Sequence, residues 1–293
     1  MAESMSTDHD PKETVKTDLH GHTAFSDGRT SPEAYVALRA SLGFEVIALS
    51  DHDTFAGVPR AAREASRLGI TIVPAMEASS FVHFGTSDAE QIHVLAYYPR
   101  SFLEPGRLEK TQMYARSLIL HERWRAFVLD WLDRRSAEER DAIDPEHVLH
   151  ALEPFAFPGL QSFIDMLVLN RQKRAFRDFH AHHVLFWTQG QELFGWSPEA
   201  LIDTIRTDGA FDVVAHPNRV RDKERMLRVL EYASGIEVYT SRHKPKTSAY
   251  FLELARSLGK HWTASTDDHQ HDAYEPPQSG SPLETVQRIL ADQ

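Results

Sequence analysis

Short, strongly apolar runs alternate with longer amphipathic segments along most of this sequence, and this alternation is the feature that most constrains the fold. Runs rich in Val, Ile and Leu predict buried strands at residues 15–19, 45–49, 70–73, 91–98, 211–215, 236–239 and 261–265. The segments between them predict helices at 31–43, 58–68, from 197 onward, 223–233 and 249–258. Repeated strand–helix units imply a parallel sheet, and about seven strands favour its closure into a barrel.

The alternation stops between residues 103 and 196, where apolar residues such as Leu120, Trp124 and Val128 recur at helical spacing. We interpret 103–196 as a mainly helical insertion that caps the active site of a barrel formed by 15–102 and 197–275. Residues 1–14 are polar and are expected to be a disordered leader, and 276–293 a C-terminal extension. Because no stretch approaches 18 consecutive apolar residues and residues 1–16 lack the apolar core of a signal peptide, we expect a cytoplasmic protein with no membrane partner.

Two features of the composition limit the possible chemistry. Cysteine is absent, which excludes disulfides, thiolate nucleophiles and sulfur-ligated zinc, so any metal must be bound through nitrogen and oxygen. Lys and Arg together number 32 and Asp and Glu 43, giving a net charge of −11. A field of this sign opposes binding to a long nucleic acid but not to a small anionic substrate, since bound divalent cations can invert the potential inside a pocket.

Ionisable residues follow nearly every predicted strand. The carboxyl ends of the strands of a parallel barrel converge on one face, so these side chains should meet in space although they are scattered along the chain. They are Asp18, His20, His22, Asp27, Asp51, His52, Asp53, Glu77, His93, His216, Asp267 and His269.

Some of these positions have more than one interpretation. His20 and His22 are two residues apart, so on an extended segment both imidazoles point to the same side and can bind one ion, although two solvent-facing loop histidines would look the same. His52 follows an apolar strand, where a charge is costly unless it is paired or metal-bound. Asp53 could instead cap the next helix, and His93, inside an apolar run, could be a core histidine.

Histidine nitrogen combined with carboxylate oxygen suits zinc, manganese or ferrous iron and disfavours a calcium cage. Two such ions roughly 3.5 to 4 Å apart can activate a water and clamp the oxygens of an in-line displacement at phosphorus. The pattern therefore indicates hydrolysis without a protein nucleophile.

Taken in order, the motifs resemble those of the PHP (polymerase and histidinol phosphatase) domain family, in particular its stand-alone phosphoesterases that act on nucleotides. The resemblance covers residues 15–98 and 197–270. The motifs are Asp18-Leu19-His20-Gly21-His22-Thr23 with Ser26-Asp27-Gly28, Ser50-Asp51-His52-Asp53-Thr54, Glu77, Ile92-His93-Val94, Ala215-His216-Pro217 and Asp267-x-His269.

The resemblance implies a distorted (β/α)7 barrel that holds two or three divalent ions, manganese, zinc or iron. By analogy, the ligands of the first ion would be His20, His22, Glu77 and Asp267. Those of the second would be Glu77, His93 and His216, and those of the third Asp27, His52 and His269. An aspartate at position 27, where histidinol phosphatases tend to carry histidine, favours the nucleotide branch.

The resemblance also implies basic groups that bind the substrate phosphate, for which the candidates are Arg219, Arg242 and His243. Both arginines could equally be solvated loop charges. Asp51 and His243 are the candidate proton carriers. The general acid is not fixed by the sequence, because water could protonate the leaving group.

The insertion departs from the family pattern. Where relatives show a Gly-Arg-Pro-His type stretch, this chain has Pro158-Gly159-Leu160-Gln161-Ser162-Phe163. A nearby cluster, His180, His182 and His183, is either a compensating pocket element or part of the packing of the insertion.

The predicted function is a metal-dependent phosphomonoesterase acting on nucleotides or similar small phosphates through a metal-activated water. Alternatives are a small or cyclic phosphodiester hydrolase, an amidohydrolase with a related metal barrel, and a non-catalytic metal-binding module. The last is disfavoured because every expected ligand position is filled. A nuclease is disfavoured by the net charge of −11, although short oligonucleotide ends remain open as substrates.

Overall fold

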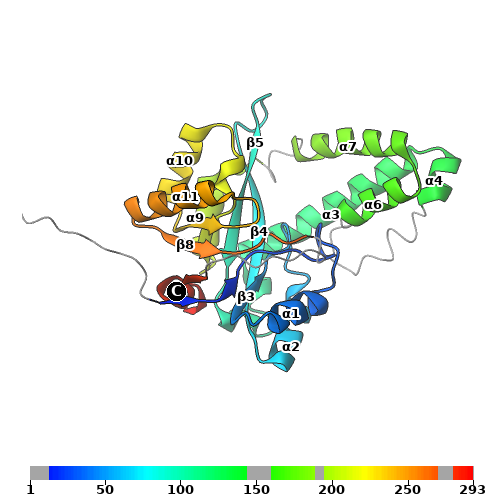
Figure 1. Ribbon diagram of the computed structural model, residues 1–293. Coiled ribbons are helices and arrows are strands. Elements are labelled where there is room, and N and C mark those ends of the chain that lie inside the picture. The colour runs from blue at the N-terminus through cyan, green and yellow to red at the C-terminus, as the bar shows by residue number, and fades with distance from the viewer. Residues whose placement is uncertain (1–12, 144–159, 189–194, 270–279, 293) are drawn as a thin grey trace, which may run out of the picture.

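The computed structural model describes residues 13–143, 160–188, 195–269 and 280–292 and contains a seven-stranded, nearly closed barrel (Figure 1). In sheet order the strands are β2 (Thr17–Asp18), β3 (Val46–Leu49), β4 (Thr71–Val82), β5 (Glu90–Tyr97), β6 (Phe211–Val214), β7 (Gly235–Tyr239) and β8 (His261–Ala264). The segments that follow β2 and β8 meet through a parallel bridge between Gly21 and Asp268. The predicted distorted (β/α)7 barrel is confirmed.

One strand departs from the predicted all-parallel sheet. β5 runs antiparallel to both of its neighbours, β4 and β6, while the other neighbouring strands are parallel. The prediction was wrong here because residues 83–89 are too few for a crossover connection, which takes a dozen or more residues, so the chain turns back as a hairpin. β4 is also much longer than predicted and continues to Val82.

The barrel helices begin and end close to the predicted positions. α1 (Pro32–Ser41) has Ser31 as its N-cap, and α2 (Val58–Leu68) ends at Gly69, whose φ of 71° suits glycine. α9 (Pro198–Thr207) begins at the predicted position, and α10 (Lys223–Tyr232) ends one residue before its predicted end. α11 (Pro245–Ser257) begins before the predicted residue 249, because Pro245 already supplies its first turn.

The two ends of the described chain pack together beneath the barrel. β1 (Thr14–Val15) pairs antiparallel with β9 (Ser281–Pro282), which leads into α12 (Leu283–Leu290). Val286 and Ile289 of α12 are buried against strand residues such as Val46 and Val73. The predicted leader was therefore wrong at residue 14, which belongs to a strand; residues 1–12 of that leader lie outside the described residues.

The insertion is helical, as predicted, and Figure 1 shows its helices projecting from one side of the barrel. They are α3 (Gln112–Asp133), α4 (Ala137–Ile143), α6 (Leu160–Leu169) and α7 (Lys173–Thr188), preceded by the short 3-10 helices η1 (Arg100–Leu103) and η2 (Leu108–Lys110). An aromatic core that includes Trp124, Trp131 and Phe179 holds them together, and Phe81 of β4 joins this core. That the insertion caps the active site stays a prediction. Among the described residues no helix has the length and apolar character needed to span a membrane.

Candidate metal centre

One fully buried carboxylate, Glu77 of β4, lies at the centre of five imidazoles. Its Oε2 atom is 3.0 Å from His20 Nε2, 3.1 Å from His22 Nε2 and 3.2 Å from His52 Nδ1. Its Oε1 atom is 2.8 Å from the Nδ1 atom of His93 and 2.9 Å from the Nε2 atom of His216. Five histidines from four separate segments of the sequence therefore meet at one side chain, as their positions after or within the strands predicted.

The fold explains how these side chains converge. His20 and His22 follow β2 on one side of an extended segment, so that their Nε2 atoms are 3.2 Å apart. His52 follows β3 and forms a parallel bridge with Glu77. His93 comes from the reversed strand β5, where it pairs with Ser79 and reaches Glu77 diagonally across the ladder.

Asp267, beyond β8, adds a second carboxylate to this arrangement. Its Oδ1 atom is 3.2 Å from His22 Nε2 and 3.6 Å from His20 Nε2. Together with Glu77 these residues form a fully buried group whose ligand atoms all lie within 4.8 Å of one another. It is the set that the resemblance implied for the first ion.

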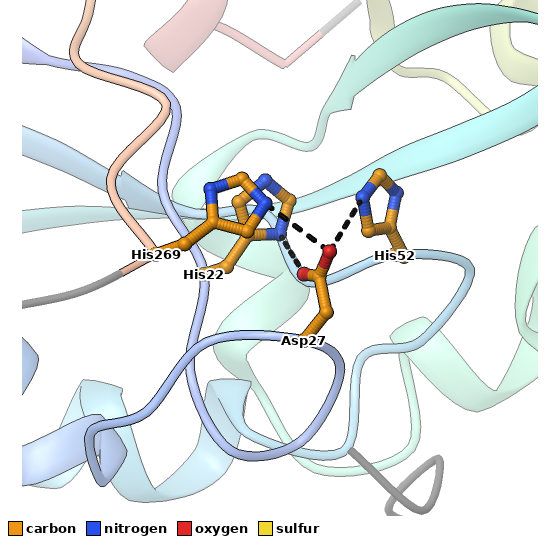
Figure 2. A group of neighbouring side chains, drawn as sticks. All are labelled: His22, Asp27, His52 and His269. Carbon is orange, nitrogen blue, oxygen red and sulfur yellow. Dashed lines mark ion pairs between the residues drawn. The ribbon is translucent and has the colours of Figure 1, made fainter. Parts of the chain in front are cut away.

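A second group surrounds Asp27, and Figure 2 shows three imidazoles turned towards its carboxylate. Asp27 Oδ2 lies 3.2 Å from His269 Nε2 and 3.6 Å from His52 Nε2, and Asp27 Oδ1 lies 3.6 Å from His22 Nδ1. The Nδ1 atom of His269 is 2.9 Å from the Asp267 carbonyl oxygen, which can only accept a hydrogen bond. A proton on Nδ1 satisfies this carbonyl oxygen, the nearer of the two polar neighbours of Nδ1, and leaves the lone pair of Nε2 for a metal ion.

Two imidazoles lie between these groups. His22 turns Nε2 to Glu77 and Nδ1 to Asp27, and His52 turns Nδ1 to Glu77 and Nε2 to Asp27. A neutral imidazole has only one lone pair, so each of these histidines can serve one ion at a time. The structure also brings ligand atoms of His52, Glu77 and His93 within 4.8 Å of one another. If His22 binds the first ion and His52 the third, then His93, His216 and the shared carboxylate of Glu77 remain for a second ion, as the resemblance implied.

Buried polar atoms without a hydrogen-bond partner indicate that these residues fit a bound cation. Glu77 Oε2 and both ring nitrogens of His93 are buried, and although Glu77 and the imidazoles lie within ion-pair distance of one another, none of these three atoms has a partner in hydrogen-bond geometry among the described residues. Such atoms are costly to bury unless an ion satisfies them. Burial lowers the pKa of His52 to about 4 and thereby keeps that imidazole neutral. Burial opposes the ionisation of Asp27, but His52 and His22 hold the pKa of this carboxyl well below its usual range.

Backbone strain concentrates at the centre. His216 and Asp267 have φ values of 26° and 55°, and Asp53, beside His52, has a φ of 49°. Residues other than glycine seldom adopt this region, and such strain persists only where the surrounding structure holds it. Asp53 is held by Arg116 of α3, whose Nη1 atom lies 2.7 Å from Asp53 Oδ1 in a buried ion pair. The insertion is thus fastened directly to the loop that carries His52.

Asp51 contacts the loop between His22 and Asp27. Its Oδ1 atom accepts hydrogen bonds from the Thr23 backbone N–H (2.7 Å) and the Ser26 hydroxyl (2.6 Å), and its Oδ2 atom accepts one from the Thr23 hydroxyl (2.6 Å). Burial raises the pKa of its carboxyl. Through these contacts Asp51 stabilises the loop that carries His22 and Asp27. They give no support to its predicted role as a proton carrier.

The three predicted phosphate-binding residues are placed differently. Arg242 is half-exposed, forms an ion pair with Asp267 and has Nη2 3.2 Å from His269 Nδ1, so it lies directly beside the centre. Arg219 is exposed and, with His93 and His216, lines a cavity of about 320 Å³. Both ring nitrogens of His243 are engaged, one with the Val238 carbonyl and one with Asn218.

The histidine cluster of the insertion belongs to α7. His183 Nε2 accepts a hydrogen bond from Trp187 Nε1 (2.7 Å), and burial lowers its pKa to about 4. His182 Nδ1 is 2.9 Å from the Asp178 carbonyl oxygen. None of the three histidines belongs to a metal-binding group among the described residues, which favours their role in packing. Of the stretch 158–163, residues 158 and 159 lie outside the described residues.

Several residues that support the centre were not predicted from the sequence. Glu237 of β7 is fully buried and contacts His20, and Arg39 of α1 is fully buried against Asp18. The available signal for Glu237 was a single acid inside an apolar strand, where a charge needs a partner. Arg39 and Arg116 lie on amphipathic helices, where an arginine ordinarily faces solvent.

Residues 18–257 match the model of the PHP domain family. The chain belongs to the PHP family. With the family, the enzyme class that the motifs predicted, a metal-dependent hydrolase of phosphate esters, is confirmed.

Relatives of this PHP chain include two kinds of curated enzyme. The 5'-3' exoribonuclease Rnm of Salmonella typhimurium is 25% identical over 89% of this chain and 87% of its own length. The 3',5'-nucleoside bisphosphate phosphatase of Chromobacterium violaceum is 25% identical over 86% of each chain. Among solved structures, a Bifidobacterium adolescentis protein assigned as a metal-dependent phosphoesterase superposes with a TM-score of 0.68 at 20% identity, covering 95% of this chain and 97% of that one. The last likeness concerns the fold.

Proposed function

We propose that this PHP protein is a phosphomonoesterase that acts on nucleotides or similar small phosphates with two or three divalent ions, manganese, zinc or iron. The observation that carries the proposal is the convergence of five imidazoles on the buried carboxylate of Glu77, with further carboxylates at Asp267 and Asp27. Neutral histidine and carboxylate ligands without sulfur are typical of hydrolytic metal centres.

The ligands would be divided as the resemblance implies. The ligands of the first ion would be His20, His22, Glu77 and Asp267, those of the second Glu77, His93 and His216, and those of the third Asp27, His52 and His269. Such ions, when bound, lower the pKa of a coordinated water and neutralise charge on the phosphate oxygens. The chain itself supplies the orientation of these ligands through hydrogen bonds to their outer atoms.

Among the described residues, Arg242 is our first candidate for binding the substrate phosphate. Its side chain is 39% exposed while it contacts Asp267 and lies beside His269, so it spans from the centre to solvent. A guanidinium has five N–H donors and matches phosphate oxygens in a fork. The cavity beside His93 and His216 has room for the rest of a nucleotide-sized substrate, and Arg219 lies on its wall.

A second candidate is removal of nucleotides from the 5' end of a short RNA, which the likeness to the 5'-3' exoribonucleases favours. The same centre would then cleave a phosphodiester. The net charge of −11 makes a long RNA the weaker proposal, because each additional phosphate meets an acidic protein.

The test is hydrolysis by manganese-loaded protein of a panel of nucleoside monophosphates and bisphosphates, sugar phosphates, cyclic phosphodiesters, terminally phosphorylated RNA and cyclic amides. Inorganic phosphate is measured directly, and the organic products are separated by chromatography. The site variant is His20→Ala. The matched control is His83→Ala, because His83 is exposed, pairs with Asp222 and lies outside every metal-binding group of the described residues.

Phosphate release from nucleotides by the wild type and by H83A, but not by H20A, would support the phosphomonoesterase. Release of nucleotides from RNA without inorganic phosphate would favour the exonuclease. Hydrolysis of cyclic amides without any phosphatase activity would favour an amidohydrolase. Inactivity across the panel, with metal bound, would point to a non-catalytic module.

A further inference from the structure

Glu237 is a buried acid that contacts His20 on the side of the imidazole opposite Glu77. It lies on β7 with its side chain fully buried. Its Oε1 atom is 2.9 Å from His20 Nδ1 and also accepts a hydrogen bond from the Ser265 hydroxyl. Its Oε2 atom accepts a hydrogen bond from the backbone N–H of His216 at 2.7 Å. Both oxygens are therefore held by donors that belong to, or adjoin, the proposed metal ligands.

We propose that Glu237 is a positioning residue that prepares two metal ligands at once. A carboxylate can only accept from His20 Nδ1, so the proton of a neutral His20 sits on Nδ1 and the lone pair of Nε2 faces Glu77 and Asp267. A carboxylate behind a histidine ligand fixes its tautomer and ring orientation and raises its basicity. Glu237 thus sets His20 for the first ion.

The other oxygen of Glu237 acts on the second ion. His216 has a φ of 26°, a conformation that residues other than glycine seldom adopt and that must be held by its surroundings. The hydrogen bond from the His216 N–H to Glu237 Oε2 helps to hold this backbone conformation. The same histidine has its Nε2 atom 2.9 Å from Glu77 Oε1. One side chain on β7 therefore links the ligand sets of the first and second ions.

An amide cannot replace this carboxylate without a conflict. Glu237 faces N–H donors on both sides, His20 Nδ1–H on one and His216 N–H on the other. In a Glu237→Gln variant the amide oxygen can satisfy only one of them, and the NH2 group then opposes the other. Either His20 changes to the tautomer whose Nε2 atom carries the proton, or His216 loses the contact that holds its backbone.

The inference rests on the proposed metal centre and is tested by metal binding rather than by turnover. Metal-free wild type, E237Q, Glu237→Asp and Ser265→Ala are titrated with Zn²⁺ against a fluorescent chelator, and the bound zinc per chain is counted. The matched control is Asp212→Asn, because Asp212 is also a fully buried carboxylate, on the neighbouring strand β6, bound to Arg206 and to the Ser234 N–H away from the centre. Circular dichroism and thermal unfolding report on folding.

We expect E237Q to bind zinc about 10- to 100-fold more weakly than the wild type, the usual cost of losing such a carboxylate. E237D keeps the charge and should recover part of the affinity, and S265A should change it little because both ligand contacts remain. D212N should lower the unfolding temperature without changing zinc affinity. Should E237Q not fold, E237D takes its place, with an intermediate loss of affinity expected.

The inference would be overturned if E237Q bound zinc as tightly as D212N and the wild type do. Where E237Q does not fold, the same result for E237D would overturn it. Either result would leave the metal centre intact. Wild-type protein that binds no zinc or manganese would refute the proposed metal centre, and this inference with it.

Discussion

Replacing Arg39 by methionine should be among the most damaging single changes at the seam of the barrel. The Arg39 side chain is fully buried, with Nε 2.9 Å from Asp18 Oδ2 and Nη2 2.9 Å from Asp268 Oδ2. Its guanidinium also lies 3.6 Å from the centroid of the Tyr35 ring. Asp18 ends β2 and Asp268 follows β8, so one arginine joins the two edges at which the barrel closes.

The magnitude follows from burial. Breaking a buried ion pair by removing one partner leaves the other charge uncompensated and costs about 3–5 kcal/mol. Methionine keeps most of the apolar stem, so the loss from packing is small. With a urea m value of about 3 kcal/mol per molar, the unfolding midpoint should fall by about 1 to 1.7 M.

The measurement is equilibrium urea unfolding of metal-free protein followed by circular dichroism. Arg60→Met is the matched control, because Arg60 makes two close contacts with Glu33 (2.6 and 2.8 Å) but both side chains are partly exposed. That variant should lose less than about 1 kcal/mol. Equal losses for R39M and R60M would refute the argument that burial at the seam decides the cost.

Three further predictions concern the centre. Arg242→Ala should lower kcat/KM for the phosphate substrate about 10- to 100-fold, as expected for a lost charge-assisted hydrogen bond, and unchanged steady-state kinetics would show that Arg242 serves only Asp267. Burial lowers the pKa of His22, but Asp27, Asp267 and Glu77 outweigh it and raise this pKa to about 10 in the metal-free protein. Metal binding at pH 8 should therefore release a proton, so that calorimetric heats differ between buffers of unlike ionisation enthalpy, and the difference should fade above pH 10; identical heats would contradict this. The same raised pKa means that the contribution of His22 to stability in the metal-free protein is full below its ordinary value of 6.5 and is lost as the pH rises towards 10. Chelation should abolish phosphate release, and manganese should restore it where calcium does not; equal recovery with calcium would argue against nitrogen ligands.

Most of the fold was readable from the sequence because its strands are buried on both faces and stand out as apolar runs. Besides the reversed direction of β5, one exception was β4, whose predicted end at Val73 falls well short of Val82. Pro74 and the polar residues Glu77, Ser79 and Ser80 looked like the end of a strand. In the structure the Ser79 N–H donates to Asp53 Oδ1 and the Ser80 hydroxyl to the Ile92 carbonyl, so these polar groups are satisfied inside the sheet.

Most of the proposed ligands could be picked out from the sequence because they lie in short motifs that follow a strand, whereas Glu77 and His93 lie inside β4 and β5. The residues that support these ligands could not, since Glu237, Arg39 and Arg116 contact partners that are far away in the sequence. The identity of such a partner depends on how strands and helices pack, and periodicity alone does not encode it. The role of His93 was also hard to predict from the sequence. Within an apolar strand it looks like a core histidine, and only the reversed direction of β5 shows that it reaches Glu77.

The acidic balance of the chain and the chemistry of its centre act over different ranges. Two or three divalent ions would bring more positive charge than the three carboxylates Asp27, Glu77 and Asp267 remove, so a phosphate at the centre would meet a positive field. At physiological ionic strength that field is screened within about 8 Å, a distance comparable to one or two nucleotides. Phosphates farther along a bound strand would instead face a protein of net charge −11. On this argument affinity should be set by the first one or two phosphates and should not grow with chain length, which is why a nucleotide or a short oligonucleotide end fits this molecule better than a long RNA.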